Sequence, residues 1–289
     1  MAKKVKGSLI YQVKSRFRDL RAYGKSKPKT SDKIYSYGTS KTYLNHCLRF
    51  ATYCRKKYNC KDLESCRPYI KEFIEDNECS PSVKKVQRSA IAKMYGVTSK
   101  DLGEIDTGER SRASVKRSRG KAIRDKHFSE TGKYKRYVDF CRGTGLRKSE
   151  VENLRGNSFK EENGQKYLYV TDSTKGGRYR TVPILKEYEN LVQEVCLQAG
   201  DNLVIPIIAP DRLKAPNGAD THSYRADYAL SLYDRLKRPI EEIPSKEKYY
   251  CRNDLKGVIL DKEAMKVVSR ALGHTRINVI AQSYLHRGI

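Results

Sequence analysis

The chain contains no apolar run long enough to cross a membrane. The longest, residues 203–209, is interrupted by Pro206, whereas a transmembrane helix needs about 20 apolar residues. The basic N-terminus is followed by only a short apolar stretch, residues 9–11, which is too little for a signal-peptide core. The eight cysteines include no C-x-x-C pair, so no zinc ribbon or thioredoxin-type site is expected. We therefore expect free thiols in a reducing cytoplasm and no membrane partner.

Two further absences concern catalysis. The sequence has no G-x-x-x-x-G-K-[ST] motif for nucleotide phosphates and no acidic cluster of the kind that holds two metal ions. We therefore expect no cofactor and no metal. If the protein acts on phosphate groups, its own cations must stabilise the charge.

Acidic residues are scarce beside basic ones. The 289 residues include 60 Lys and Arg but 34 Asp and Glu, which gives a formal net charge of +26. Hydrophobic residues make up 38% of the chain, so a wholly disordered basic tail is excluded. A charge this high repels itself unless a polyanion neutralises it. Nucleic acid is the first candidate, and an anionic membrane surface the second.

The first part of the chain has helical periodicity. Apolar residues at helical spacing predict helices over 8–23, 39–58 and 68–76, and Ser80 before Pro81 begins another that ends at Gly96. No strand is expected here. Residues 1–105 are therefore predicted to form a small all-α domain.

A segment rich in Ser, Gly and Arg follows, at residues 106–124, and we interpret it as an interdomain linker. Either it is a solvated tether or it lies along phosphates, and the second interpretation is favoured in so basic a chain. The predicted DNA contacts of this stretch are Arg110, Arg112, Lys116, Arg117, Arg119 and Lys121.

The remaining residues, 125–289, mix helix and strand. Two hairpins are predicted, one from 166–170 and 181–184 around a Gly-Gly turn, the other from 249–252 and 257–260. Helices are expected between and after them, at 134–140, 186–199, 221–236, 262–272 and 278–284. The predicted fold class is thus two-domain, with an all-α domain followed by an α+β domain.

Polar residues gather at the ends of these predicted elements. Arg147 follows G-T-G-L at the start of a helix, where backbone N–H groups and a guanidinium can face one anion. Lys175 lies in the first hairpin turn, and His222 and Arg225 share a helix face at spacing i, i+3. His274 follows Gly273 at a helix end, and Tyr284 comes ten residues later. Each residue alone is more typical of a surface or core position.

Together and in order, the strings G-T-G-L-R-x-S-E, T-K-G-G-x-x-R-T-V-P, H-x-x-R, L-G-H and a late Tyr resemble the tyrosine recombinase, or phage integrase, family. The resemblance covers nearly all of 125–289. It implies a tyrosine-recombinase catalytic domain there, and the helical first part then corresponds to the family's core-binding domain on architecture alone.

The resemblance also implies a role for each matched residue. Arg147 and Arg225 would bind the scissile phosphate, and Lys175 would be the general acid on the leaving 5′-oxygen. His222 would assist proton transfer, His274 would hydrogen-bond the phosphate, and Tyr284 would be the nucleophile. Glu150 would be a buried structural partner.

This chemistry is independently reasonable. Two arginines offer planar forks to a phosphodiester and to the more highly charged phosphorane that follows. A phenol is a poor nucleophile until a cationic pocket favours its phenolate. A tyrosyl phosphodiester conserves the energy of the broken DNA bond, so religation needs no ATP.

The sequence departs from the family pattern in two places. Extra residues at 236–261 contain the second hairpin, which either contacts DNA or a neighbouring subunit or is a surface loop. Only five residues follow Tyr284, so exchange of a C-terminal helix between protomers is in doubt. We also expect no full separate arm-binding domain before the first helices.

The predicted function is site-specific DNA recombination through a 3′-phosphotyrosyl intermediate, with integration and excision of a mobile element favoured. The expected partners are a double-stranded recombination site, a homo-tetramer on two sites, and an accessory DNA-bending or directionality factor. The expected location is a prokaryotic cytoplasm, at the nucleoid during action. Xer-type dimer resolution, a type IB topoisomerase and a non-catalytic DNA-binding regulator are the alternatives.

Overall fold

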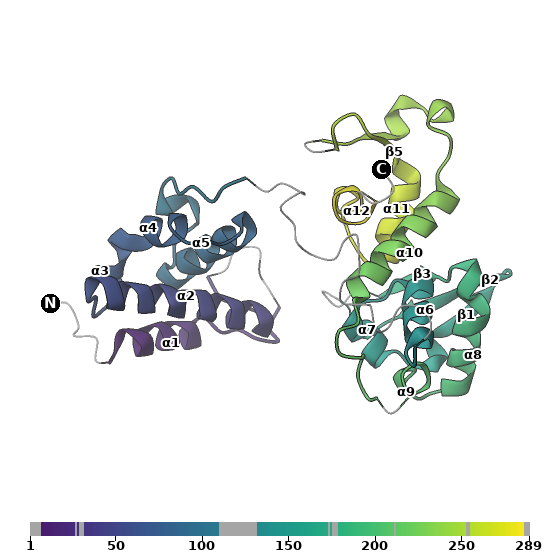
Figure 1. The fold of residues 1–289 in the computed structure, drawn as a ribbon, viewed down its shortest axis with the longest axis horizontal. Coiled ribbons are helices and arrows are strands. Elements are labelled where there is room, and N and C mark those ends of the chain that lie inside the picture. The colour runs from purple at the N-terminus through teal and green to yellow at the C-terminus, as the bar shows by residue number, and fades with distance from the viewer. Residues whose placement is uncertain are drawn as a thin grey trace. The chain divides into compact units, whose positions relative to one another are not determined.

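The structure is a computed structural model that describes residues 7–26, 28, 32–109, 132–172, 174, 179–210, 212–252 and 255–285. The chain divides into two compact units, Met1–Ser114 and Val115–Ile289 (Figure 1). Each unit has its own cluster of buried hydrophobic residues. Most of the predicted linker, residues 110–124, lies outside the described residues, so the boundaries 1–105, 106–124 and 125–289 stay predictions.

The first unit is built from helices, as predicted. Its elements are α1 (Leu9–Asp19), α2 (Tyr37–Tyr58), α3 (Leu63–Cys66), α4 (Ile70–Glu75) and α5 (Pro81–Tyr95). The predicted helix over 68–76 begins with a 3₁₀ turn at Arg67–Tyr69 and continues as α4, and the short α3 before it was not predicted. Pro68 in that turn has no backbone N–H to donate to a continuous helix.

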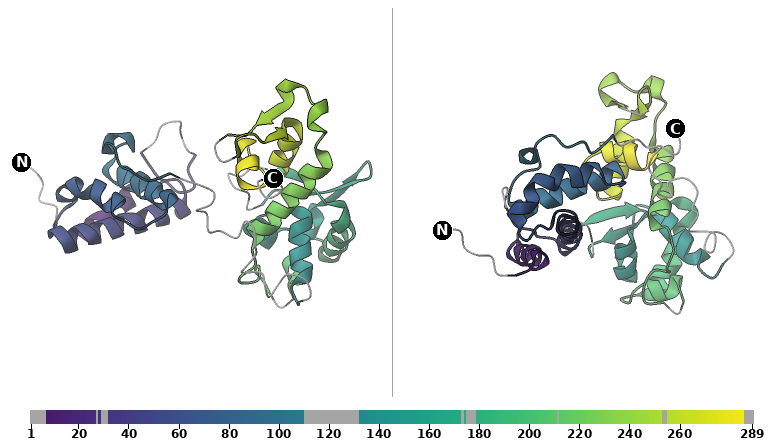
Figure 2. Two further views of the ribbon diagram at one scale, coloured as in Figure 1. Left: turned by 45° about the horizontal axis from the view of Figure 1, so that its top comes forward. Right: turned by 60° about the vertical axis from the view of Figure 1, so that its left-hand side comes forward.

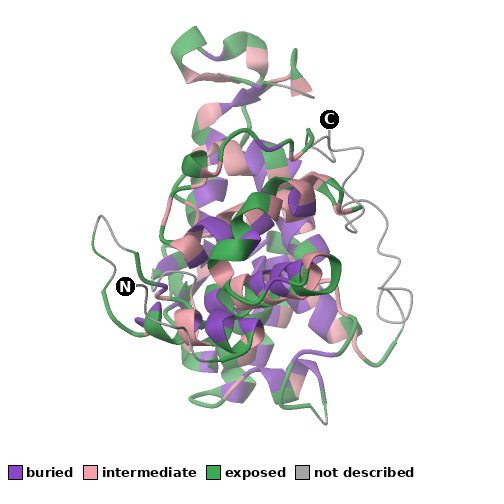
Figure 3. Ribbon diagram, turned by 90° about the vertical axis from the view of Figure 1, so that its left-hand side faces the viewer, coloured by how far each residue is buried: buried purple, intermediate pink, exposed green. Residues whose placement is uncertain are grey.

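Helix α2 is the central helix of this unit and packs against α1 and α5. Ser36 begins it, since its side chain accepts a hydrogen bond from the backbone of Thr39, and Asn59 ends it in a left-handed conformation with φ 52°. The long helices carry buried residues along one side and exposed residues along the other (Figure 3). Phe50 and Cys54 of α2 are fully buried.

The second unit combines helices with two small sheets. Its helices are α6 (Lys135–Thr144), α7 (Lys148–Asn153), α8 (Glu189–Ala199), α9 (Ile205–Ile208), α10 (Thr221–Leu236), α11 (Lys262–Ala271) and α12 (Asn278–Ser283). Its strands are β1 (Phe159–Glu162), β2 (Gln165–Val170), β3 (Arg180–Pro183), β4 (Lys248–Tyr250) and β5 (Ile259–Asp261). The predicted mixture of helix and strand in 125–289 is therefore confirmed.

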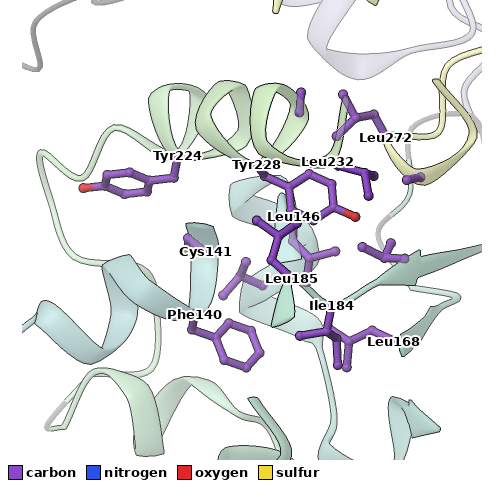
Figure 4. Packing of buried hydrophobic residues seen from close by; sticks show 14 of the residues in the cluster. Phe140, Cys141, Leu146, Leu168, Ile184, Leu185, Tyr224, Tyr228, Leu232 and Leu272 are labelled. Carbon is purple, nitrogen blue, oxygen red and sulfur yellow. The ribbon is translucent and has the colours of Figure 1, made fainter. Parts of the chain in front are cut away.

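The larger sheet has the order β1-β2-β3, and both pairs are antiparallel. Strand β1 was not predicted. Helix α11 packs against β3, and α10 packs against both α6 and α11. Figure 4 shows the rings of Tyr224 and Tyr228 on the α10 ribbon, with Leu146 and Leu185 close to Tyr228. The Tyr228 hydroxyl donates a hydrogen bond to the Pro183 carbonyl at 2.7 Å, which joins α10 to the sheet.

The extra residues 236–261 end in the predicted second hairpin, β4 paired with β5. Both views of Figure 2 show this region extending away from the three-stranded sheet. Its two ends are joined by Arg238 and the fully buried Asp261. The Arg238 guanidinium donates from Nε and Nη2 to the two carboxylate oxygens of Asp261, each at 2.8 Å. This ion pair holds the two ends of the insertion together where they meet α10 and α11.

None of the helices within the described ranges is long and apolar enough to span a membrane.

Candidate active site

The G-T-G-L-R string forms the junction between α6 and α7. Gly145 ends α6 with φ +57°, and a Cβ there would lie 2.3 Å from the Tyr228 ring, so only glycine fits. Leu146 is fully buried. Arg147 then occupies the N-cap position of α7, as predicted, and its side chain is 19% exposed.

Glu150, in the first turn of α7, holds Arg147 in place. Its carboxylate accepts the Arg147 backbone N–H at 2.7 Å and the Arg147 Nη1 at 2.6 Å. It also accepts both terminal nitrogens of Arg180, at 2.9 and 2.7 Å. Burial raises the pKa of Glu150, but the hydrogen bonds and charges of Arg180 and Arg147 outweigh burial and lower it to about 2. The carboxylate is therefore ionised and fully hydrogen-bonded.

The C-terminal end of α11 brings the two predicted phosphate-binding arginines together. The last carbonyls of a helix have no partner within it. Here the Leu272 carbonyl accepts Nη2 of Arg147 at 3.0 Å and also Nη2 of Arg225. Two guanidinium groups that are 78 residues apart in sequence thus converge on one oxygen atom, which carries only a partial negative charge.

Arg225 is the most deeply buried cation of the site, with 1% of its surface exposed. It donates to the carbonyls of Gly145 and Leu272 and to the Tyr284 hydroxyl. Burial lowers its pKa to about 10; Tyr284 opposes this shift, and the nearby Arg147 cation adds to it. Arg225 therefore remains a cation at neutral pH. Among the described residues no carboxylate forms an ion pair with it.

Tyr284 follows α12 and points its hydroxyl group at Arg225 and His274. The hydroxyl oxygen lies 3.3 Å from Arg225 Nε and 3.2 Å from His274 Nε2. The tyrosine is 7% exposed. His274 is positioned by the turn after α11, since its backbone N–H donates to the Ser269 carbonyl at 2.8 Å. Arg147, Arg225, His274 and Tyr284 are therefore linked within one chain.

The other predicted site residues are placed differently. His222 lies on α10, three residues before Arg225, and its side chain is exposed. Lys175 lies outside the described residues, in the segment that joins β2 to β3. The predicted linker contacts, Arg110, Arg112, Lys116, Arg117, Arg119 and Lys121, also lie outside them.

Arg180 has a place in the site that sequence reasoning missed. It belongs to the T-K-G-G-x-x-R-T-V-P string, begins β3 and is 8% exposed. The signal was its position in a strand whose alternate residues, Arg180 and Val182, are buried. An inward-facing arginine needs an acidic partner, and Glu150 is that partner.

Within the described ranges, no group of three or more His, Cys, Asp or Glu side chains is arranged to hold a metal ion.

No protein-family model and no curated protein matches the sequence. Solved structures do match. The XerH site-specific recombinase in a post-cleavage complex with difH DNA is 16% identical, with a TM-score of 0.57, over 98% of this chain and 94% of that chain. Its pre-cleavage complex is also 16% identical, with a TM-score of 0.52, over 96% and 93%.

The Tn1549 transposon integrase, bound to circular-intermediate DNA, is 12% identical with a TM-score of 0.47, over 96% of this chain and 95% of that one. The likeness to XerH shows that this chain has the fold of the tyrosine recombinases. The fold expected from the resemblance is confirmed.

Proposed function

We propose that this protein is a site-specific DNA recombinase that cuts and rejoins strands through a 3′-phosphotyrosyl intermediate. One observation carries the proposal. Arg225 is buried with no carboxylate in an ion pair among the described residues, and it donates to the hydroxyl of Tyr284. A buried cation without a counter-ion is costly, and an anion bound beside Tyr284 would remove that cost. The fold shared with XerH supports the same chemistry.

The proposed reaction begins with a scissile phosphodiester held by Arg147 and Arg225. The Tyr284 oxygen attacks phosphorus, and the bond from phosphorus to the 5′-oxygen breaks. The two guanidinium groups stabilise the charge that develops on the phosphorane. His274 accepts the tyrosine proton at its Nε2, and the protonated nitrogen then donates a hydrogen bond to the phosphate. Lys175 protonates the departing 5′-oxygen, and His222 assists that proton transfer. A 5′-hydroxyl then reverses the step on a new strand.

Integration and excision of a mobile element remains the favoured role, with Xer-type dimer resolution as the alternative. The proposed partners are a double-stranded recombination site, a homo-tetramer on two sites and an accessory DNA-bending or directionality factor. Incubation with plasmids that carry the DNA flanking the gene would separate these roles. Joining of element ends supports the integrase role, and resolution of plasmid dimers the Xer-type role. Relaxation of a supercoiled plasmid without a site would indicate a topoisomerase.

The test of the chemistry uses Tyr284→Phe, which removes one hydroxyl group. Nicked suicide duplexes from the flanking DNA are incubated with each protein in EDTA without ATP, then denatured. The wild-type protein should form a covalent protein–DNA adduct. The Phe variant should bind the DNA with unchanged affinity and form none. Tyr250→Phe, at an exposed position of β4, is the matched control and should form the adduct normally. DNA binding by the wild-type protein without any adduct would instead indicate a non-catalytic regulator.

A further inference from the structure

Arg180 lies behind the site and touches none of the atoms that would react. Its guanidinium meets the Glu150 carboxylate with two parallel hydrogen bonds, at 2.9 and 2.7 Å, and its Nε donates to the Ala271 carbonyl at 2.8 Å. The side chain of Arg180 is 6% exposed and that of Glu150 is fully buried. The same carboxylate accepts two hydrogen bonds from Arg147. Glu150 thus accepts two guanidinium hydrogen bonds from Arg180, and one guanidinium and one backbone hydrogen bond from Arg147.

We propose that Arg180 is a positioning residue that supplies the counter-charge of Glu150, so that Arg147 keeps a net positive charge toward the scissile phosphate. This inference rests on the proposed function. Glu150 alone would orient Arg147 but would also neutralise it. Two guanidinium groups around one carboxylate leave a net charge of +1. A preorganised charge of that kind stabilises the negative charge that develops in the transition state.

The contacts of Arg180 with α11 give it a second positioning effect. Ala271, Leu272 and Gly273 are consecutive, and they precede His274. Gly273 has φ +65°, and a Cβ there would lie 3.1 Å from Arg180 Cδ. The arginine stem therefore packs directly on the turn that presents the Leu272 carbonyl and His274. Loss of this stem would displace groups on both sides of the phosphate, and displacements of about 1 Å cost roughly 100-fold in rate.

Four variants and two DNA duplexes separate the effect of the Arg180 charge from the effect of its position. Arg180→Met keeps the length of the stem but leaves Glu150 to neutralise Arg147. Glu150→Gln/Arg180→Met removes both buried charges and restores the net +1 of Arg147. Arg180→Lys keeps the charge without the planar fork. Arg235→Met is the control, since Arg235 pairs with Glu187 where both side chains are more than 40% exposed. The first duplex is the nicked suicide substrate that forms an adduct with the wild-type protein.

Single-turnover adduct formation should fall about 100-fold in Arg180→Met at unchanged DNA affinity. The Glu150→Gln/Arg180→Met variant should recover at least about 10-fold of that loss, and Arg180→Lys should lie between Arg180→Met and the wild type. A duplex with a neutral methylphosphonate at the scissile position needs less charge stabilisation, so the Arg180→Met defect should shrink on it. A double variant as slow as Arg180→Met, with an equal defect on both duplexes, would show that Arg180 contributes no charge and overturn the proposal.

A second readout does not depend on recombination. In urea unfolding, Arg180→Met leaves the buried Glu150 carboxylate with the hydrogen bonds of Arg147 alone, whereas the double variant has a neutral side chain at position 150, so the double variant should unfold at a higher urea concentration than the single one. The reverse order would also overturn the proposal. If the wild-type protein forms no adduct but the unfolding order holds, the proposed function fails while Arg180 stands as the counter-charge of Glu150.

Discussion

At the scale of single residues, Arg225 is the side chain whose surroundings differ most from those of an ordinary arginine. An arginine that is 1% exposed normally pairs with a carboxylate, as Arg180 does with Glu150. Arg225 has two backbone carbonyls and a phenol instead. Its desolvation is incompletely compensated in the free protein, and a bound phosphate would supply the missing negative charge. A phosphate bound by Arg225 would therefore lie next to the Tyr284 hydroxyl group.

Lys175 gives a test of proton transfer at the same scale. Lys175→Ala should slow cleavage of ordinary DNA by about 10²–10⁴-fold if it removes the general acid. With sulfur in place of the bridging 5′-oxygen, the leaving thiolate needs no proton, so the variant should regain most of its rate. Gel quantification of the covalent adduct at single turnover measures the cleavage rates on both duplexes.

Arg147→Ala is the control for that substrate, because sulfur cannot replace a guanidinium that stabilises charge. It should remain slow on both duplexes. If the sulfur-containing duplex does not restore the cleavage rate of Lys175→Ala, the lysine is a phosphate contact, and His222 becomes the candidate general acid.

At the scale of elements, the base of the inserted hairpin predicts a measurable stability effect. Asp261 is the N-cap of α11 and pairs with Arg238, whose side chain is 42% exposed while that of Asp261 is 1% exposed. Arg238→Ala leaves a buried carboxylate without its cation and should lower the free energy of unfolding by more than the loss of an exposed ion pair does. Asp234→Ala breaks the exposed pair with Lys237 and should change it by less than about 1 kcal/mol. Urea unfolding compares the two.

The pH dependence of this effect has a definite sign. The hydrogen bonds from Arg238 lower the pKa of Asp261 below its ordinary value. Stability from a lowered carboxyl pKa is present above the unfolded value, about 3.9, and is lost as the pH falls below it. The difference in the free energy of unfolding between the wild type and Arg238→Ala should therefore become smaller as the pH falls from 5 to 2. If this difference in the free energy of unfolding does not change with pH, the Arg238–Asp261 pair stabilises the fold through packing alone.

The sequence predicted well the elements whose apolar residues follow a regular period between clear end signals. Helix α10 has the predicted bounds, and α11 ends at Ala271, one residue before the predicted end, with Leu272 as its C-cap and Gly273 following. Strand β1 was missed because only Phe159 of its four residues is even partly buried, so no alternation is visible. Helix α9 was missed because Ile-Pro-Ile-Ile is short and uniformly apolar, although Pro206 in its first turn is a helix-start signal.

The position of a candidate site residue was predictable where that residue lies at the end of an element. Arg147 at its N-cap and Tyr284 beside His274 are of this kind. The contributions of the Leu272 carbonyl and of Arg180 were not predictable, because they depend on contacts between segments far apart in sequence. Arg180 and Glu150 are 30 residues apart in the sequence, and they become neighbours only in the folded chain, where β3 packs against α11.

At the scale of the whole molecule, the net charge of +26 predicts that DNA binding depends strongly on salt. Each phosphate that the protein neutralises releases condensed counter-ions, which contributes about −0.9 to the slope of log affinity against log salt. If Arg117 and Arg119 contact phosphates, Arg117→Ala/Arg119→Ala should make the slope about 1.8 less steep. Affinity should fall to a similar degree for all sequences, because phosphate contacts carry no base information. Fluorescence anisotropy over a salt series measures the slope.

Arg235→Ala/Lys237→Ala is the matched control, because it lowers the net charge by the same two units at exposed, ion-paired positions of the second unit. If only total charge matters, both double variants should flatten the slope equally. If the segment around Arg117 binds the backbone, only the first should do so. A loss confined to the cognate duplex, with the slope on random DNA unchanged, would mean that these arginines recognise bases or groove shape rather than phosphates. The predicted phosphate contact would then be wrong, and the salt dependence would have to come from other basic residues of the chain.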